Sequence, residues 1–327
     1  MGRTPVLLLD ARERLSVAAA SLGARCAALG AEAEALAASI ADPRLDFRAQ
    51  VLERRRAGLA LNRALAHAEL DEVLDAVVRS GGAVAASHPL ERGGEDLTSA
   101  LNADWGGGAE AESEVREVCG WAGSLIDQTV RPGGKALFLG AGTGRHVVEL
   151  AGRFGESWAV DLSVDRTWLF ERVLRQPLAF AAFEDGAPMS RDGLTRLART
   201  EPPASSAHLH LAVADARCLP LADAGATHVV SIYFTDMVPL HQLLPEAWRV
   251  LVPGGTFMHV GPLDYAFPDP AWRLAPEELP EAFRRFGFEI DSLRAQPMEF
   301  RRSSQSGIQV IYRGLVFRAR KTELPAG

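Results

Sequence analysis

Residues 137–150 read LFLGAGTGRHVVEL, an apolar run followed by three closely spaced glycines and then a helix-like pattern. A strand–loop–helix unit of this kind turns backbone N–H groups and a helix N-terminus toward one point, which favours a ligand with a polar tail. Gly140 would permit the turn, whereas Gly142 and Gly144 would let the backbone approach the ligand closely. A dinucleotide-binding loop would have its third glycine where Arg145 stands. The loop alone therefore predicts a nucleotide-like ligand without choosing one.

The chain around this loop alternates between apolar runs and stretches with helical periodicity. The apolar runs span residues 136–140, 157–161, 208–213, 227–233 and 255–261. This alternation predicts an α/β fold with a doubly wound, mainly parallel sheet. The last two apolar runs, 287–293 and 308–319, have no long helix between them. They predict a hairpin-like return and an antiparallel strand at one edge of the sheet.

The N-terminal part of the chain has a different pattern. Residues 11–80 are rich in Ala, Leu, Glu and Arg, with apolar residues at helical spacing. We expect three or four amphipathic helices there, with a break near Asp42-Pro43 and an end at the Ser80-Gly81-Gly82 stretch.

A stretch rich in Gly, Ser and Ala follows over residues 83–110 and predicts a loop that carries Asp104 and Trp105. Residues 112–130 predict another helix. The expected domains are an N-terminal helical subdomain with its linker over residues 1–110 and an α/β domain over residues 111–327.

Composition excludes several classes of function. The 327 residues carry a net charge of −7 and scattered arginines, so no nucleic-acid partner is expected. Three cysteines lie far apart in the chain, which excludes a disulfide framework and a CxxC metal site. No apolar run reaches 18 residues, and the apolar stretch near the start is too short for a signal peptide. We expect a soluble cytoplasmic protein with no metal and no membrane partner, and a homodimer stays open.

Two acidic residues follow later apolar runs. Asp161 ends WAVD in the segment 158–163, 21 positions after Gly140. A carboxylate there can accept hydrogen bonds from a ribose diol, although an Asp can also cap the next helix. Asp215 and Ala216 would place a carboxylate and a backbone N–H at the next strand end, within reach of an adenine edge. The chain then continues through another strand and helix to the turn LVPGG.

The glycine loop, the acidic ribose residue, the Asp-Ala pair and the LVPGG turn, in this order, resemble class I S-adenosylmethionine-dependent methyltransferases. The resemblance covers residues 130–320 or so, and it implies a Rossmann-like seven-stranded sheet with S-adenosylmethionine as cofactor. The cofactor-binding residues that it implies are Gly140, Ala141, Gly142, Gly144, Arg145, Asp161, Leu162, Ser163, Asp215, Ala216, Ile232 and Trp105.

A narrower resemblance covers Tyr233 to Lys321. The segments YFTDMVPL, GPLDYAF, LAPEELPEAF and YRGLVFRARK are similar to the carnosine N-methyltransferase family. The resemblance implies that Asp236 faces the acceptor nitrogen and that Tyr265 and Tyr312 contact the substrate.

Several positions depart from that family. The family has an Arg-Asp-Trp element, and Ala103 stands where its arginine meets the carboxylate end of the cofactor. Another cation, such as Arg145 or Arg131, would have to bind the carboxylate of the cofactor in its place. Ala266 replaces a substrate-binding histidine, and EFRRS at 299–303 replaces an aromatic stretch. Carnosine itself is therefore disfavoured as the acceptor, and Arg301 and Arg302 are either exposed or meet an anionic group.

Asp236 is the residue whose chemistry matters most for methyl transfer to nitrogen. A carboxylate can orient the nitrogen through its N–H and stabilise the positive charge that grows on methylation. The alternative is that Asp236 caps a helix starting near Pro239. His241 and His259 are alternative general bases. His208 and His210 share one side of a strand, but no third metal ligand has suitable spacing.

We therefore expect an S-adenosylmethionine-dependent methyltransferase that methylates an imidazole- or amine-like nitrogen of a small molecule or peptide. One alternative is an O-methyltransferase of a specialised metabolite. A second is a non-catalytic protein that binds the cofactor as the partner of another enzyme. A dinucleotide-dependent dehydrogenase is disfavoured by the spacing of the glycine loop.

Overall fold

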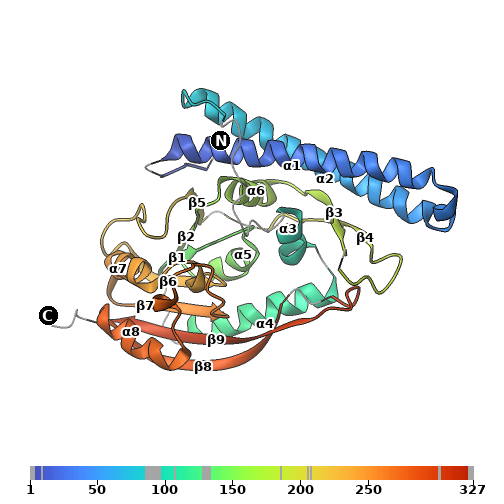
Figure 1. The fold of residues 1–327 in the computed structure, drawn as a ribbon. Helices are drawn as coiled ribbons and strands as arrows, with labels where there is room; N and C mark the ends of the chain where they lie inside the picture. The colour runs from blue at the N-terminus through green and yellow to red at the C-terminus, as the bar shows by residue number, and fades with distance from the viewer. Residues whose placement is uncertain are drawn as a thin grey trace.

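A central seven-stranded sheet organises the protein (Figure 1). The computed structural model describes residues 4–8, 10–84, 97–106, 108–126, 134–184, 186–204, 206, 208–300 and 303–322. The strands are β1 (Lys135–Leu139), β2 (Glu156–Asp161), β5 (Leu209–Val213), β6 (Ala226–Ile232), β7 (Leu251–Gly261), β8 (Phe288–Phe300) and β9 (Val310–Lys321). Their order in the sheet is β5-β2-β1-β6-β7-β9-β8, which confirms the doubly wound fold.

The strand directions confirm the expected antiparallel end of the sheet. Strands β5, β2, β1, β6 and β7 pair in parallel, whereas β9 is antiparallel to both β7 and β8. Because the strand order reverses between β1 and β6, the carboxyl ends of these strands form a crevice of the kind that binds ligands in open α/β sheets.

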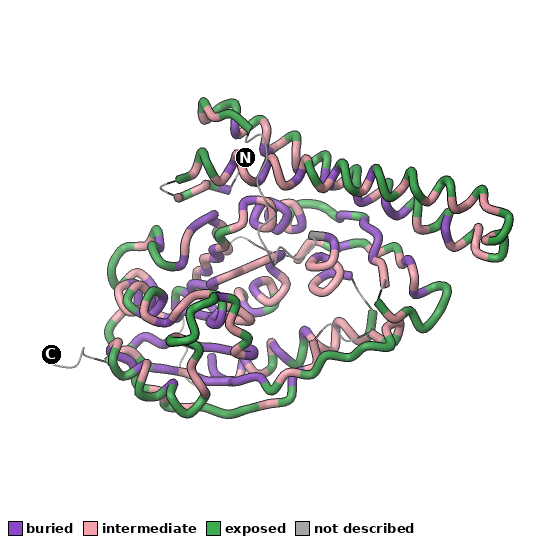
Figure 2. The backbone as a smooth tube through the Cα atoms, in the orientation of Figure 1, coloured by how far each residue is buried: buried purple, intermediate pink, exposed green. Residues whose placement is uncertain are grey.

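Helices cover both faces of the sheet, and two apolar cores lie beneath them. The helices α4 (Ala109–Ile126) and α5 (Arg145–Ala151) pack on one face, and α7 (Leu240–Val250) and α8 (Leu279–Arg285) pack on the other. Figure 2 shows the central strands as the most continuously buried part of the chain. None of the described helices is both long and apolar enough to cross a membrane.

Aromatic side chains fill the core on the α7/α8 face. Phe257, Phe283, Phe288 and Phe317 are all fully buried. The ring centroid of Phe283 lies 5.6 Å from that of Phe257 and 5.3 Å from that of Phe317. Burying each ring contributes on the order of 1.5–3 kcal/mol, so this cluster anchors β7, β8 and β9 to α8.

The N-terminal region forms a long helical hairpin that lies along one side of the sheet domain (Figure 1). It consists of α1 (Ala11–Ile40), a 3-10 turn at Pro43–Arg48, and α2 (Ala49–Arg79). The prediction of three or four helices was wrong, because the chain breaks only once. At that break the side chain of Asp42 accepts a hydrogen bond from the backbone of Arg44 at 2.9 Å, and α2 starts directly afterwards.

A buried ion pair joins this hairpin to α6 (Val164–Arg175). Glu69 on α2 is fully buried and lies 3.0 Å from the guanidinium of Arg172, which also lies 2.9 Å from Glu72. Side chains of α1 and α2 also pack on Trp168 of α6. Because removing one partner of a buried pair leaves an uncompensated charge, this contact fixes the hairpin on the domain.

Two elements correct the sequence-based prediction. Residues expected to be part of a loop over 83–110 instead form α3 (Leu97–Trp105), whose Leu101 and Trp105 are buried one helical turn apart. A hairpin of β3 (Ala179–Phe183) and β4 (Thr195–Arg199) also occurs, where only helical stretches were expected. Both elements are short and rest on few large apolar side chains, so their patterns are weak in the sequence. Residues 85–96 of the expected loop lie outside the described part of the chain.

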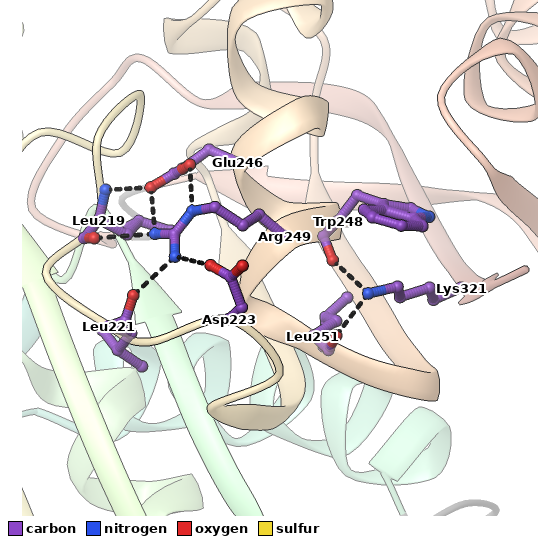
Figure 3. Close-up of polar contacts among 8 residues, drawn as sticks. All are labelled: Leu219, Leu221, Asp223, Glu246, Trp248, Arg249, Leu251 and Lys321. Carbon is purple, nitrogen blue, oxygen red and sulfur yellow. Dashed lines mark hydrogen bonds and ion pairs between the residues drawn. The ribbon is translucent and has the colours of Figure 1, made fainter. Parts of the chain in front are cut away.

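Arg249 and Lys321 hold together the amino ends of β6 and β7 (Figure 3). The Arg249 guanidinium donates to Glu246 at 2.6 Å and to Asp223 at 2.7 Å. The Lys321 ammonium donates to the carbonyls of Trp248 and Leu251, both at 2.7 Å. Two cations at the C-terminal end of α7 complement the helix dipole. This end of the sheet is structural, and the candidate site lies at the opposite edge.

Candidate functional site

The glycine loop after β1 has the conformation that its sequence predicted. Gly140, Gly142 and Gly144 have φ angles of +61°, +56° and +85°, a region that other residues rarely adopt. A Cβ atom on Gly140 would lie 2.1 Å from the ring of Phe234, and one on Gly144 would lie 2.1 Å from the ring of Phe170. A Cβ on Gly142 would meet no atom within 4 Å. Gly142 therefore borders open space, as a loop that receives a ligand requires.

Asp161 at the end of β2 holds the glycine loop directly. Its Oδ2 accepts a hydrogen bond from the amide of Gly142, and its Oδ1 accepts one from the amide of Ser163, both at 2.9 Å. Burial raises the pKa of this carboxyl. The residue that caps α6 is Ser163, so the alternative that Asp161 is the helix cap is wrong. Each carboxylate oxygen has a second lone pair, which leaves capacity for a diol.

Asp215, the expected adenine-side residue, already has a charged partner. Its carboxylate accepts hydrogen bonds from the Arg217 guanidinium at 2.6 and 3.0 Å, and this interaction holds the pKa of Asp215 below its usual range. Ala216 is buried beside it, whereas Leu162 is 37% exposed at the end of β2. Leu162, directly after β2, therefore gives this edge an exposed apolar side chain.

The end of α3 supports the glycine loop from the outside. The indole Nε1 of Trp105 donates to the carbonyl of Thr143 at 2.9 Å, and the Thr143 hydroxyl bonds to the carboxylate of Asp104. Trp105 is only 6% exposed and packs in an apolar cluster with α6 and β3. The contacts of Trp105 are therefore those of helix packing and of support for the glycine loop.

Arg145 is less available than the sequence suggested. Its guanidinium lies 2.8 Å from Glu112 and 3.0 Å from Glu149, and its central carbon lies 5.1 Å from the centre of the Trp105 ring. To replace the arginine that is missing at Ala103, it would have to exchange one of these partners. The other expected cation at position 131 and the arginines at 301 and 302 lie outside the described residues.

Asp236 follows β6 in a short 3-10 turn, Thr235–Met237, and is only 5% exposed. Its Oδ2 accepts from the amide of Asp264 at 2.8 Å, and its carbonyl accepts from the amide of Ala266 at 3.1 Å. Its Oδ1 is buried and has no hydrogen-bond partner among the described residues. Burial, helped by the charge of Asp264, raises the pKa of Asp236 to about 6. The cap of α7 is Pro239, so the alternative that Asp236 caps this helix is wrong.

The two tyrosines expected to contact substrate lie in different surroundings. The Tyr265 hydroxyl donates to the carbonyl of Leu274 at 2.7 Å, and burial with the nearby Asp236 charge helps raise its pKa to about 12. Tyr312 on β9 packs on the core of the α4/α5 face, with its ring centroid 5.6 Å from that of Phe300. The structure therefore brings Tyr265 close to Asp236 and places Tyr312 with a second group of aromatic residues.

The histidines considered as bases are poorly placed for proton transfer. His259 is fully buried, its Nε2 lies 3.1 Å from the carbonyl of Gly261, and burial lowers its pKa to about 4. It is therefore neutral and enclosed in the sheet. The ring of His241 packs against that of Trp272, with centroids 4.1 Å apart and the ring planes tilted by 37°. Among the described residues, no three His, Cys, Asp or Glu side chains are grouped so that they could hold a metal ion.

Tyr233 lies at the same edge of the sheet as Asp236, and the sequence did not single it out. It is the first residue after β6, and its φ of +54° is positive although it is not glycine. Its amide donates to the carbonyl of Val260 at 2.9 Å. Its ring centroid lies 6.0 Å from that of His146 and 5.7 Å from that of Phe300. The only signal in the sequence was an aromatic residue directly after a buried strand, which is too common to single it out.

Comparison with known proteins agrees with this geometry. Residues 185–259 match the profile of a family described as a methyltransferase domain. The matched segment contains β5, β6 and α7 and most of β7, and it includes Asp215, Tyr233 and Asp236. A search of curated proteins found no match.

Solved structures similar to the chain include three methyltransferases. A SAM-dependent methyltransferase from Methanosarcina mazei is 19% identical, with 61% of this chain and 97% of that chain covered and a TM-score of 0.44. A putative methyltransferase from Bacillus halodurans is 13% identical, with 62% and 99% covered and a TM-score of 0.45. A Haemonchus contortus phosphoethanolamine N-methyltransferase, solved with phosphomonomethylethanolamine and S-adenosylhomocysteine, is 15% identical, with 72% and 60% covered and a TM-score of 0.46.

At these identities the likeness concerns the fold alone, and none of the comparisons points to carnosine N-methyltransferases in particular. The matched domain and the order of the seven strands agree with each other. The profile match indicates a methyltransferase domain that includes residues 185–259.

Proposed function

We propose that the protein is an N-methyltransferase whose acceptor is an imidazole- or amine-like nitrogen of a small molecule or peptide. The observation that carries this proposal is Asp236. Its buried carboxylate stands at the carboxyl edge of the sheet with one oxygen that has no partner among the described residues. The division into a helical region over 1–110 and a methyltransferase domain over 111–327 is part of the proposal.

The residues proposed to hold the cofactor surround the glycine loop. The amides near Gly142 and the open space beside it would receive the polar end of the ligand, and Asp161 would accept the ribose hydroxyls. Leu162 would contact the adenine. Further proposed contacts are Gly140, Ala141, Gly144, Arg145, Ser163, Asp215, Ala216, Ile232 and Trp105. When bound, S-adenosylmethionine supplies a methyl group on a sulfonium, and the neutral thioether is left as the N–C bond forms.

Asp236 would act on the acceptor through its unpartnered oxygen. An ionised carboxylate there accepts the N–H of the acceptor, which fixes the direction of the nitrogen lone pair, and it stabilises the positive charge that develops. With a pKa of about 6, Asp236 is ionised at neutral pH and can take up the proton that nitrogen loses. Tyr265 stands beside it and, with Tyr312, is a proposed substrate contact.

A carboxylate, even one whose pKa is raised by burial, favours nitrogen over oxygen as the methyl acceptor. A neutral amine or imidazole already has a free lone pair, so it needs orientation more than deprotonation. An alcohol must lose a proton to become comparably nucleophilic, and a carboxylate with a pKa of about 6 is a weak base for that step.

The proposal is tested by incubating the full chain with methyl-labelled S-adenosylmethionine and a panel of histidine-containing dipeptides, small amines and phenols. Product mass and fragmentation identify the methylated atom. We expect methylated nitrogen products. Exclusive methylation of oxygen would replace the proposal with an O-methyltransferase. Cofactor binding without any product from the panel would favour a non-catalytic role.

A further inference from the structure

The chain makes a sharp turn between the end of β6 and Asp236. Tyr233, the first residue after β6, has a φ of +54°, which is rare for a residue other than glycine. The turn lies close to the end of β7, because a Cβ atom on Gly261 would be only 3.1 Å from the Tyr233 nitrogen. Backbone strain of this kind persists only where the surrounding structure maintains it, so the contacts that hold the turn are informative.

A backbone hydrogen bond and a pair of hydroxyl groups hold this turn closed. The amide of Tyr233 donates to the carbonyl of Val260 at 2.9 Å. The hydroxyl oxygens of Ser231 and Thr235 lie 2.7 Å apart and form a hydrogen bond across the turn. Ser231 is the next-to-last residue of β6, and Thr235 directly precedes Asp236. The hydroxyl pair therefore ties the strand to the residue before the proposed catalytic carboxylate.

The Ser231–Thr235 hydroxyl pair is enclosed in the protein. Ser231 is 0% exposed and Thr235 is 1% exposed. Replacing both partners of a buried hydrogen bond by apolar groups of the same shape can leave stability nearly unchanged. A fully satisfied buried polar contact instead favours one arrangement of the groups around it. The hydroxyl pair thus fixes the direction of the turn more than it stabilises the fold.

The direction of the turn decides where the Asp236 carboxylate lies. Its Oδ2 accepts from the amide of Asp264 at 2.8 Å, and its carbonyl accepts from the amide of Ala266 at 3.1 Å. A shift of Thr235 would move both of these acceptors. It would also move Oδ1, the buried oxygen proposed to meet the acceptor nitrogen.

We propose that the Ser231–Thr235 hydroxyl pair positions Asp236 for methyl transfer by holding the strained turn at Tyr233. This inference rests on the proposed function and deepens it. Both side chains are enclosed, so they act through Asp236 and are positioning residues. Misplacing a reacting group by about 1 Å can slow a reaction on the order of 100-fold.

The first test replaces the hydroxyl pair by apolar groups in the variant Ser231→Ala/Thr235→Val, which leaves neither partner buried alone. Single-turnover methyl transfer to an acceptor from the panel should fall roughly 10- to 100-fold. The affinity for S-adenosylmethionine and the unfolding temperature should stay near those of the wild type. Thr235→Ser keeps the hydroxyl and should retain most of the rate. Near-wild-type transfer by the double variant, or an equal loss of cofactor affinity, would overturn the inference.

The matched control is another buried polar pair between the same two strands. The Thr256 hydroxyl on β7 lies 2.8 Å from Nδ1 of His228 on β6, and both residues are 4% exposed. Thr256→Val should lower the unfolding temperature, because His228 loses its partner, but transfer should keep the wild-type rate. A comparable slowing of transfer in this control would overturn the assignment to Ser231 and Thr235.

The second test is hydrogen exchange of the full chain, resolved to single amides, which needs no acceptor. The amides of Tyr233 and Asp264 report the turn and the carboxylate directly, since they donate to Val260 and to Asp236. Both should exchange roughly 10-fold faster in the double variant, whereas the amide of Val230 within β6 should not change. Unchanged exchange of the Tyr233 and Asp264 amides would overturn the inference.

Repeating the double variant in an Asp236→Asn background separates this inference from the proposed function. If the hydroxyl pair acts through Asp236, its loss slows transfer no further in that background. Additive losses would overturn the inference and leave the role of Asp236 standing. Normal transfer by Asp236→Asn alone would instead end the proposed role of Asp236, while hydrogen exchange would still show whether the hydroxyl pair holds that residue in place.

Discussion

Replacing Asp161 with alanine tests how the cofactor is held. The substitution removes both hydrogen bonds from the amides of Gly142 and Ser163, and with them the proposed acceptor of the ribose hydroxyls. A hydrogen bond to a charged group contributes about 1.5–3 kcal/mol. Loss of one such hydrogen bond between Asp161 and the ribose would raise the dissociation constant of the cofactor roughly 10- to 150-fold. Asp161→Asn, which keeps one acceptor oxygen, should fall between the wild type and Asp161→Ala.

The assay is titration calorimetry with S-adenosylmethionine and, separately, with NADH. Glu156→Gln is a matched control, because Glu156 lies at the opposite end of β2 and pairs with Lys135 at 2.7 Å near the surface. It should bind the cofactor like the wild type. Unchanged affinity in Asp161→Ala would refute the assignment of the ribose to this residue. Binding of NADH without binding of S-adenosylmethionine would refute the choice of cofactor.

Three further predictions concern the loop, the base and the helical hairpin. Gly142→Ala should weaken cofactor binding while the protein still folds. Gly144→Ala should instead lower the thermal unfolding temperature sharply, because its Cβ has no room beside the Phe170 ring. The prediction is contradicted if the two variants change cofactor affinity and unfolding temperature equally. With Asp236 ionised above its pKa of about 6, kcat/KM should rise as pH increases through 6, and Asp236→Asn should show only the titration of the acceptor. The double variant Glu69→Ala/Glu72→Ala should lower the free energy of unfolding by about 3–5 kcal/mol in urea, since Arg172 would lose both of its carboxylate partners; a change below 1 kcal/mol or so would contradict it.

The parallel sheet could be predicted from the sequence because its strands are buried on both faces and appear as uninterrupted apolar runs. The glycine loop could be predicted because positive φ angles and close packing leave few alternatives to glycine. The short α3 and the β3–β4 hairpin could not, because each depends on tertiary contacts of one or two large residues, such as Trp105.

The site was only partly accessible from the sequence. Asp236 could be located because it follows a buried strand, but its bond to the amide of Asp264 depends on how a distant loop returns. The pairing of Arg145 with Glu112 joins two helices and could not be inferred from spacing. The strained backbone of Tyr233 is a property of the folded chain, and the residue type gives no sign of it.

Methyl transfer by Asp236→Asn, measured in a single turnover with cofactor affinity determined on the same samples, tests the central claim most directly. The control is Asp269→Asn, which alters an exposed aspartate that caps a neighbouring 3-10 turn. We predict that Asp236→Asn binds S-adenosylmethionine normally and transfers the methyl group at least ~100-fold more slowly, and that the control matches the wild type. Near-wild-type transfer by Asp236→Asn would contradict the account.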